Sequence, residues 1–522
     1  MTRSLVAGRL AVAATHTQAA LAVHAPHLVD GFLAALPGAA DTVGRRLLGA
    51  LVREDLVPDT GQGRRHAFHR VEFDRAGADD PVALLPDGLP GNAAGFAAEL
   101  RNAVINLAIA TARPGRLAAD DPDAEAINLE RLAVAGHNLH PCGRTRLGWD
   151  ATDVLAYDLE AGRTTVGFVA VRRDAHLGDD VGAALRAAYP QLPEPPPGYR
   201  LQPVHPWQRD NRFAELVDAG VLRRLDAEVV AEPTAALRTL LLPVAADGRR
   251  HYVKVSLDIQ VTSTRRSISV ASTRNGPAVS RLLHRLLAGE ERLLLMAETA
   301  GAAVPAGSGR DVAAILRDGL TGQLTAGERA VPGGALPYLI GGLVDESGLG
   351  AAGWLDAYTK LLLPPLLRLT AQGVALEAHL QNCLPTFVAG RPHRLAVRDF
   401  AGLRVHPGRL AAAGESVDLW PGSVVGTTDE TVLRAKIGYT ALQAHLGELV
   451  IRLGESHGLD EAAAWRTVRA VVDETYETLP GARADHAAFT APTVPHKALV
   501  RMRLLGGGDA YLDVENPLHA PA

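Results

Sequence analysis

Cysteine is nearly absent from this chain, with only Cys142 and Cys383 in 522 residues. A disulfide framework is therefore excluded, and a reducing compartment, the cytoplasm, is the expected location. No uncharged run reaches the roughly 20 residues that a membrane-spanning helix needs. Gly8, Arg9 and His16 interrupt the apolar N-terminal stretch, which favours an amphipathic helix over a signal peptide.

An excess of positive charge is also missing. The chain has 53 Lys and Arg against 58 Asp and Glu, a formal net charge of −5. Because nucleic-acid-binding proteins are usually basic, we expect neither a nucleic-acid nor a membrane partner.

The chain is long and 47% of its residues are hydrophobic, which predicts several domains and a large core. Helical and strand patterns are segregated along it, which is typical of an α+β fold with antiparallel sheets. Five prolines fall within residues 190–198, and this stretch suits a stiff connector. We therefore expect three domains: residues 1–195, residues 196–340, and residues 341–522 with a helical C-terminal part. Apolar periodicity predicts helices over residues 277–300, 354–372, 430–457 and 495–505, and strands over 252–261, 384–388 and 395–397.

Residues 136–149 form a loop rich in histidine and arginine, because Gly136, Pro141 and Gly143 break regular structure. His137, His140, Arg144 and Arg146 offer clustered donors that suit a phosphate or carboxylate. A polar surface loop is the simpler alternative. A metal site at His137, His140 and Cys142 is a third, although the neighbouring arginines repel a cation and the spacing fits no common zinc pattern.

The stretch KVSLDIQVTSTRRSI, residues 254–268, reads as a strand that ends in a hydroxyl-rich, basic turn. Backbone N–H groups, hydroxyls and guanidinium groups in such a turn can cradle a polyphosphate. Arg238 and Arg317, each on a neighbouring predicted strand, add positive charge. An exposed polar edge strand is the alternative. The candidate nucleotide-binding residues of this stretch are Lys254, Thr262, Ser263 and Arg266.

Residues 377–384, EAHLQNCL, and residues 398–402, RDFAG, flank a predicted hairpin. Asn382 and Asp399 can converge there, and a carboxylate with an amide is what Mg²⁺ on a nucleotide requires. Kinase-like phosphotransferases use the same logic, with a lysine on an earlier strand; Lys254 takes that place here, with Glu298 on a predicted helix as its partner. Alternatively, Asn382 and Asp399 satisfy only the backbone of a turn.

Taken in order, these stretches resemble the NRPS-independent siderophore (NIS) synthetases, the IucA/IucC or aerobactin-synthetase-like family. The family's first motif, G-H-P-x-H-P-x-x-K-x-R-x-G, corresponds to GHNLHPCGRTRLG at residues 136–148. HPWQ at 205–208, Arg238-Thr239-Leu240, KVSLDIQVTSTRRSI, EAHLQN and RDFAG follow in the family's order. Lys497, MRL at 502–504 and NPL at 516–518 match its C-terminal landmarks, so the resemblance covers residues 130–518.

The resemblance implies a cupped-hand architecture of thumb, fingers and palm, with ATP and Mg²⁺ bound between fingers and palm. It implies an enzyme that adenylates a carboxylic acid, such as citrate, a citrate derivative or a succinyl acid, and then joins it to an amine, hydroxylamine or alcohol. A homodimer is also implied. Residue by residue, it assigns phosphate binding to Ser263, Arg266 and Arg317, nucleotide and metal binding to His379, Asn382, Glu377 and Asp399, and contact with the reacting groups to His137 and Arg144.

Three positions depart from the family pattern. Asn138 replaces a proline, Arg144 replaces a lysine and Ala236 replaces a serine. Since arginine and lysine are not interchangeable at a binding site, these changes bear on the substrate more than on the chemistry. Two other functions stay open: a kinase-like phosphotransferase, and a catalytically weak binding paralogue. Release of pyrophosphate separates adenylation from phosphotransfer, which releases ADP.

Overall fold

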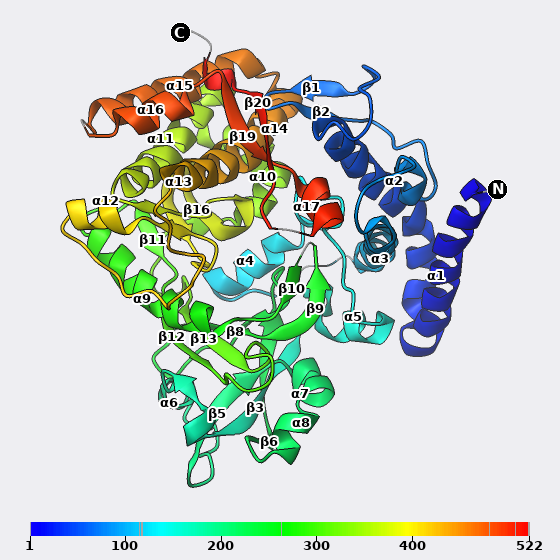
Figure 1. Cartoon of the computed structure of the whole chain (residues 1–522), viewed down its shortest axis with the longest axis vertical. Coiled ribbons are helices and arrows are strands. Elements are labelled where there is room, and N and C mark those ends of the chain that lie inside the picture. Colours follow the sequence, from blue (N-terminus) through cyan, green and yellow to red (C-terminus); the bar gives the residue numbers. More distant parts are fainter. Residues whose placement is uncertain are drawn as a thin grey trace.

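The computed structural model describes residues 2–113, 115, 118–262, 264–479, 481–506 and 508–519; within them, the side chains of residues 2–8 and of residue 264 are not described. The elements form three groups, with N-terminal helices on one side, C-terminal helices on the other and a large sheet below them (Figure 1).

The N-terminal group is mainly helical. It contains α1 (Thr2–His24), α2 (Val29–Arg53), α3 (Ala93–Thr111), α4 (Pro122–Glu130), α5 (Ala151–Tyr157) and the hairpin β1 (Arg64–His66) and β2 (Arg70–Glu72). Side-chain caps set its helix starts: Asn92 accepts from Gly95 N, and Asp121 accepts from Ala124 N just ahead of Pro122. Leu47, Phe96 and Leu100 are fully buried in one core cluster, which holds α2 against α3.

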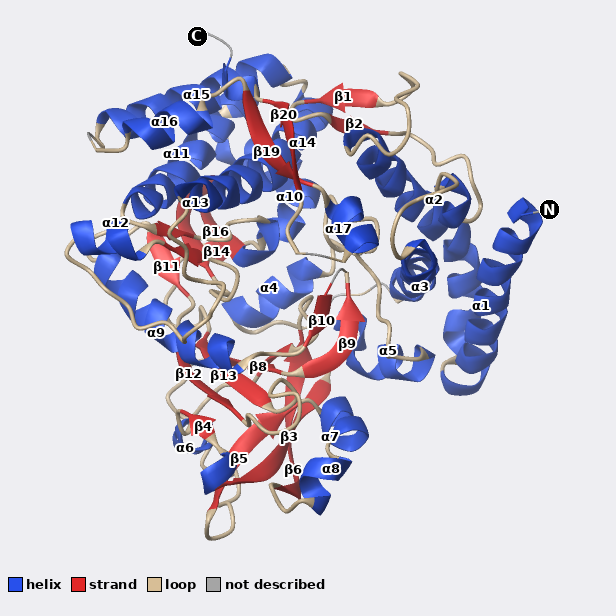
Figure 2. Ribbon diagram, in the orientation of Figure 1, coloured by secondary structure: helices blue, strands red, loops and turns tan. Residues whose placement is uncertain are grey.

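An eight-stranded antiparallel sheet forms the second group (Figure 2). Its order is β4 (Leu177–Gly178), β12 (Glu298–Ala303), β13 (Ala313–Asp318), β8 (His251–Val255), β7 (Thr239–Leu241), β6 (Leu222–Pro233), β3 (Thr164–Arg172) and β5 (Tyr199–Val204). Packed near it are α6 (Val181–Ala188), α7 (Pro206–Arg212), α8 (Ala214–Asp218) and α9 (Val270–Leu286). After β8 the chain continues as the hairpin β9 (Leu257–Val261) and β10 (Thr264–Arg266), which reaches toward the centre of the molecule (Figure 2).

The C-terminal group surrounds a smaller sheet of order β11 (Leu293–Leu295), β17 (Arg391–Val397), β16 (Cys383–Val388) and β14 (Arg329–Ala330), in which β11 and β17 are parallel. Trp354, Tyr358 and Phe387 stack in its core, with ring centroids 5.0 and 6.0 Å apart. Its helices are α10 (Leu336–Ser347), α11 (Gly350–Ala371), α12 (Pro407–Ala412), α13 (Glu430–Ile437), α14 (Gly447–His457), α15 (Glu461–Glu477), α16 (Arg483–Phe489) and α17 (Leu499–Leu505). A π-helical segment, Gly438–Leu446, joins α13 to α14, and two short ladders pair β15 (Val374–Ala375) with β18 (Arg404–Val405) and β19 (Thr493–Lys497) with β20 (Tyr511–Glu515).

The predicted α+β, multi-domain fold is confirmed, as are the helices near residues 354–372 and 430–457 and the strands 384–388 and 395–397. The helix predicted over residues 277–300 is wrong in its second half, because β11 and β12 follow α9. Residues 297–303 are rich in alanine and favour a helix locally, but pairing with β13 and β4 makes them a strand. Likewise, residues 495–505 divide into the end of β19 and α17.

The predicted domain borders remain predictions, although both sheets extend across them. β3 and β4 precede residue 195 yet belong to the large sheet, and β14 precedes residue 340 yet pairs with β16. The prolines of residues 190–198 interrupt regular structure, but they do not determine on which side of them the sheet begins. Among the described residues, no helix is long and apolar enough to cross a membrane.

Candidate active site

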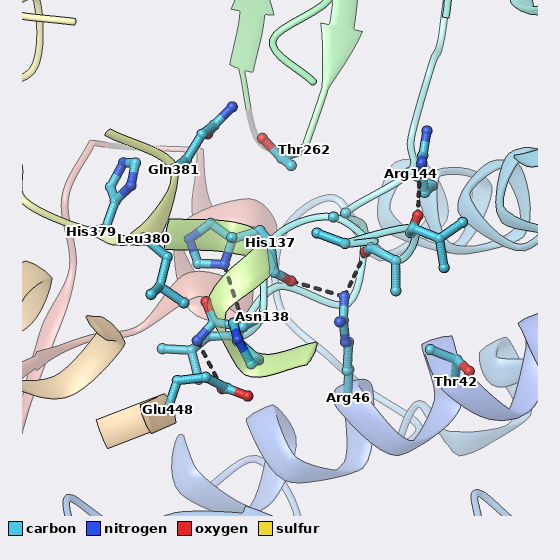
Figure 3. A pocket seen from close by; sticks show the side chains of 18 of the residues that line it. Thr42, Arg46, His137, Asn138, Arg144, Thr262, His379, Leu380, Gln381 and Glu448 are labelled. Carbon is cyan, nitrogen blue, oxygen red and sulfur yellow. Dashed lines mark hydrogen bonds between the residues drawn. The ribbon is translucent and has the colours of Figure 1, made fainter. Parts of the chain in front are cut away.

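A cavity of about 740 Å³ lies where the three groups meet (Figure 3). Its walls come from α2, the loop of residues 135–146, the β9–β10 turn, residues 379–381 and one face of α14. Of the predicted site residues, His137, Arg144, Thr262, Arg266 and His379 line it, as do Asn138 and Arg146, which the sequence also singled out. Segments that are distant in sequence thus meet at one space.

The β9–β10 hairpin presents Arg266 to this cavity. Arg266 Nη2 donates to Thr262 Oγ1 at 3.3 Å, and its buried Nε has no hydrogen-bond partner. Burial, and then the nearby Arg238 and Arg146, lower the pKa of Arg266 to about 9. Arg265 points outward and pairs with Asp258 at 2.7 Å. Ser263, also predicted to bind phosphate, lies outside the described residues.

Behind the hairpin, Lys254 joins the large sheet to the C-terminal group. Lys254 lies on β8 between β7 and β13, is 3% exposed, and its Nζ is 2.6 Å from Asp399 Oδ1. Burial favours a raised pKa at Asp399, but Lys254 and Arg238 outweigh it and hold the pKa well below its usual range. Asp399 lies two residues after the end of β17 and has a left-handed φ of 65°, a conformation uncommon for a residue with a side chain.

Glu298 and Arg317 lie opposite each other on β12 and β13. Both Glu298 carboxylate oxygens are buried without a hydrogen-bond partner, and burial raises the pKa of Glu298. Glu298 is on a strand, not on the predicted helix, and Lys254 pairs with Asp399 instead. The Arg317 guanidinium lies over the Tyr252 ring, 4.6 Å from its centroid, and its Nε also has no partner.

The segment before β16 carries the predicted residues Glu377, His379 and Asn382. Lys436 Nζ lies 3.0 Å from Glu377 Oε1. Burial opposes ionisation of Glu377, but Lys436 and His379 outweigh it and lower its pKa to about 2. Asn382 Nδ2 donates to Glu377 O at 3.0 Å, and Asn382 O accepts from Arg398 N at 3.0 Å. This second contact ties Asn382 to the strand end that leads into Asp399.

His137 lies next to His379, with 6.2 Å between the ring centroids and the rings edge to face. His137 Nδ1 accepts from Leu139 N at 3.1 Å, so in the neutral ring Nε2 carries the proton. Burial lowers the pKa of both histidines. Asn138 Nδ2 donates to Ala444 O at 3.1 Å. It also donates to Glu448 Oε2 at 3.0 Å (Figure 3). Asn138, which replaces a proline of the family motif, therefore ties the loop to the C-terminal group.

Arg144 is held in ion pairs. Its guanidinium is 4% exposed and contacts Val134 O, Asp158 Oδ1 at 3.3 Å and Glu160 Oε1 at 2.5 Å. Arg146 binds Asp158 as well, with Nε 2.9 Å from Oδ2. Figure 3 shows Arg144 apart from His137 and His379. This geometry gives Arg144 a role in fixing the loop, and its predicted contact with the reacting groups stays a prediction.

Magnesium was predicted at Glu377, Asn382 and Asp399. Among the described residues, no group of three or more His, Cys, Asp or Glu side chains is arranged to hold a metal ion. Mg²⁺ bound to a nucleotide needs only one or two protein oxygens, since phosphates and water supply the rest. Asp399 and Glu377 are each paired with a lysine through one oxygen, Asp399 with Lys254 and Glu377 with Lys436. The carboxylate of Asp399 and the amide of Asn382 are oxygen donors of the kind that this requirement names. Cys142 and Cys383 are both buried, and burial raises the pKa of both thiols.

Several residues of the site carried no signal in the sequence. Arg46 and Arg53 on α2, and Lys436 on α13, lie on ordinary amphipathic helices. Arg46 Nη1 donates to Ala135 O at 2.6 Å and to His137 O at 2.9 Å (Figure 3). Its position against the loop depends on packing between segments 90 residues apart, which no local pattern records.

Comparison with known proteins agrees with this geometry. Residues 125–338 match the sequence model described as "IucA / IucC family", and residues 352–512 match "Ferric iron reductase FhuF-like transporter". The chain is 26% identical to staphyloferrin A synthase of Staphylococcus aureus, over 74% of this chain and 72% of that protein. It is 25% identical to D-ornithine–citrate ligase of the same organism, over 75% and 70%.

Solved structures share the whole fold. The petrobactin biosynthesis protein AsbB of Bacillus anthracis superposes with a TM-score of 0.81 at 20% identity, covering 94% of this chain and 98% of that one. ATP-bound aerobactin synthetase IucA of Klebsiella pneumoniae gives 0.72 at 20% identity, covering 92% and 99%. The fold is therefore that of the siderophore synthetases. The sequence match over residues 125–338 and the curated relatives point to the same group of proteins, the IucA/IucC family.

Proposed function

We propose that this protein is an ATP-dependent NIS synthetase that adenylates a carboxylic acid and condenses it with an amine, hydroxylamine or alcohol. One observation carries the proposal: Arg266, Arg238 and Arg317 gather beside the Lys254–Asp399 pair, and none of the three has an ion-pair partner among the described residues. Buried guanidinium groups without carboxylates suit a polyphosphate.

In the proposed first step, a carboxylate oxygen of the acid attacks the α-phosphorus of ATP. The bond to the bridging oxygen breaks, and pyrophosphate leaves with its charge held by Arg266 and the adjacent cations. In the second step, the amine nitrogen attacks the acyl carbon, the C–O bond to AMP breaks and a proton leaves the nitrogen. Catalysis of both steps rests on positioning and electrostatic stabilisation.

Residues on the far side of the cavity support this chemistry. His137 and His379 are neutral near pH 7, since burial lowers the pKa of each. The His137 Nε2–H group is available to donate to an oxygen that gains charge. Asp399 and Asn382 would hold Mg²⁺, which neutralises phosphate charge when bound.

The relatives' names guide the substrate proposal. Staphyloferrin A synthase and D-ornithine–citrate ligase are named for siderophore and citrate chemistry. We therefore favour citrate, a citrate derivative or a succinyl acid as the acid substrate, ATP as co-substrate, and a cytoplasmic homodimer that takes part in iron acquisition.

The test is a reaction of the protein with ATP, Mg²⁺, citrate or another di- or tricarboxylic acid, and hydroxylamine. Acid-dependent release of pyrophosphate with hydroxamate formation is expected. Release of ADP instead would favour the kinase-like phosphotransferase, and no turnover with any acid would favour a binding paralogue.

A further inference from the structure

At its N-terminal end, the cavity has a second cluster of cations, on α2. Arg46 and Arg53 are seven residues apart, so they lie on the same face of the helix, and both line the cavity. Neither forms an ion pair with any carboxylate among the described residues, and burial lowers the pKa of both.

Arg53 gives the stronger evidence for a bound anion, because its guanidinium has buried donors for which the described part of the chain offers no acceptor. It is 5% exposed, and its Nε and Nη2 are buried without a hydrogen-bond partner. The adjacent Glu54 does not serve it, because the Glu54 carboxylate accepts from Val500 N and Arg501 N, at 3.0 and 2.8 Å. A buried guanidinium with unused donors is costly unless a ligand anion completes it.

The carboxylates around these two arginines are bound to other groups. Glu72 and Glu448 are shared between Arg70 and Arg452, with Glu448 Oε2 2.6 Å from Arg70 Nη2 and Glu72 Oε1 2.9 Å from Arg452 Nη2. Glu448 and Glu72 are therefore each bound to a guanidinium group, and neither forms an ion pair with Arg46 or Arg53; Glu448 acts on Arg46, and Glu54 on Arg53, only through space.

On the basis of the function proposed above, we infer that the amine substrate itself carries a carboxylate. Arg46 and Arg53, which form the α2 wall of the cavity, bind this carboxylate. The triphosphate is already served by Lys254 on β8, Arg266 on β10 and Arg317 on β13. The α2 wall lies behind the His137 loop, where Arg46 donates to the carbonyl oxygens of Ala135 and His137. A carboxylate matches the planar fork of a guanidinium. Its attached amine can then point toward His137 and the acyl group, while a plain diamine offers the two guanidinium groups no anion to bind.

The test compares amines that differ only in a carboxylate: ornithine with 1,4-diaminobutane, and lysine with 1,5-diaminopentane. Calorimetry measures their binding to the whole protein in the presence of ATP, which needs no turnover. We expect the carboxylated member of at least one pair to bind at least 10-fold more tightly. Arg53→Gln should reduce that preference 10- to 100-fold, and Arg53→Lys should restore part of it. Arg45→Gln is the charge-matched control, because Arg45 is already paired with Asp41 at 2.9 Å, and it should keep the wild-type preference.

Exchange of pyrophosphate with ATP, driven by the acid without any amine, serves as the second readout. Arg53→Gln should leave this exchange unchanged, which also shows that the variant is folded. Equal binding within both pairs would overturn the inference. A loss of exchange in Arg53→Gln with a raised KM for the acid would also overturn it, because Arg46 and Arg53 would then bind the acid substrate. If the wild-type protein showed no exchange but still bound carboxylated amines selectively, the proposed function would be contradicted. The inference that Arg46 and Arg53 bind the carboxylate would stand.

Discussion

Lys254 Nζ and Asp399 Oδ1 lie 2.6 Å apart, although 145 residues separate them in the chain. This ion pair joins β8 of the large sheet to the end of β17 in the C-terminal group. The same two residues border the cation cluster proposed to bind ATP. The contact therefore ties the large sheet to the C-terminal group beside the proposed nucleotide site.

Replacing Asp399 by asparagine should lower kcat at least 100-fold while the protein stays folded. The change removes a hard oxygen for Mg²⁺, and Glu298, which interacts electrostatically with Lys254, keeps that lysine from being left without a counter-charge. Steady-state rates at saturating Mg²⁺, with a melting curve as control, measure this. An unchanged rate would show that Asp399 is structural.

Arg266→Ala should lower kcat roughly 10- to 100-fold, corresponding to one charge-assisted contact of about 1.5–3 kcal/mol. We expect kcat to fall more than the KM for ATP rises, because the leaving pyrophosphate is where charge accumulates. Arg265→Ala is the matched control, since its side chain is exposed and paired with Asp258. Small and equal effects of the two substitutions would place the phosphate site elsewhere.

Arg144→Ala should destabilise the protein by about 3–5 kcal/mol, because it leaves Glu160 buried without its partner. Arg144→Lys should recover part of this loss. The control is Arg172→Ala, which breaks an exposed pair with Asp174 and should cost at most about 1 kcal/mol. If Arg144→Ala kept its denaturation midpoint and lost only activity, Arg144 would instead contact substrate.

Glu377 should make stability depend on pH. Its pKa is about 2 in the folded protein against 4.5 ordinarily, so its contribution is complete above about pH 5 and declines as the pH falls toward 2. The unfolding free energies of the wild type and of Glu377→Gln should therefore differ by about 3 kcal/mol at pH 7 and by roughly half of that at pH 3. Denaturation midpoints between pH 7 and pH 3 measure this, with the exposed Glu477→Gln as control. A difference that stays constant across this range would contradict the role given to Lys436.

The sequence predicted the residues of the site better than their partners. His137, Arg266 and His379 occur in motifs whose order and spacing belong to one family, and they line one cavity. Arg144 also belongs to such a motif, but it forms ion pairs with Asp158 and Glu160. Nothing in the motif itself predicts these two carboxylates. The partner of Lys254 was likewise misplaced, because Glu298 lies on a strand whose alanine-rich neighbourhood favours a helix.

Arg46, Arg53 and Lys436 could not be found from the sequence for a related reason. On an amphipathic helix, a basic residue is usually a solvated one. Only the packing of α2 against the His137 loop, and of α13 against residue 377, turns these side chains inward.

The most direct test of the account follows oxygen from the acid. With both oxygens of the reacting carboxylate labelled with ¹⁸O, a single turnover in the presence of hydroxylamine should transfer one ¹⁸O into the phosphate of AMP, because the acyl–oxygen bond breaks when the amine attacks. Mass spectrometry of the released nucleotides and phosphates reads this result. Label in inorganic phosphate, with ADP as the nucleotide product, would show transfer of the γ-phosphoryl group and would contradict adenylation.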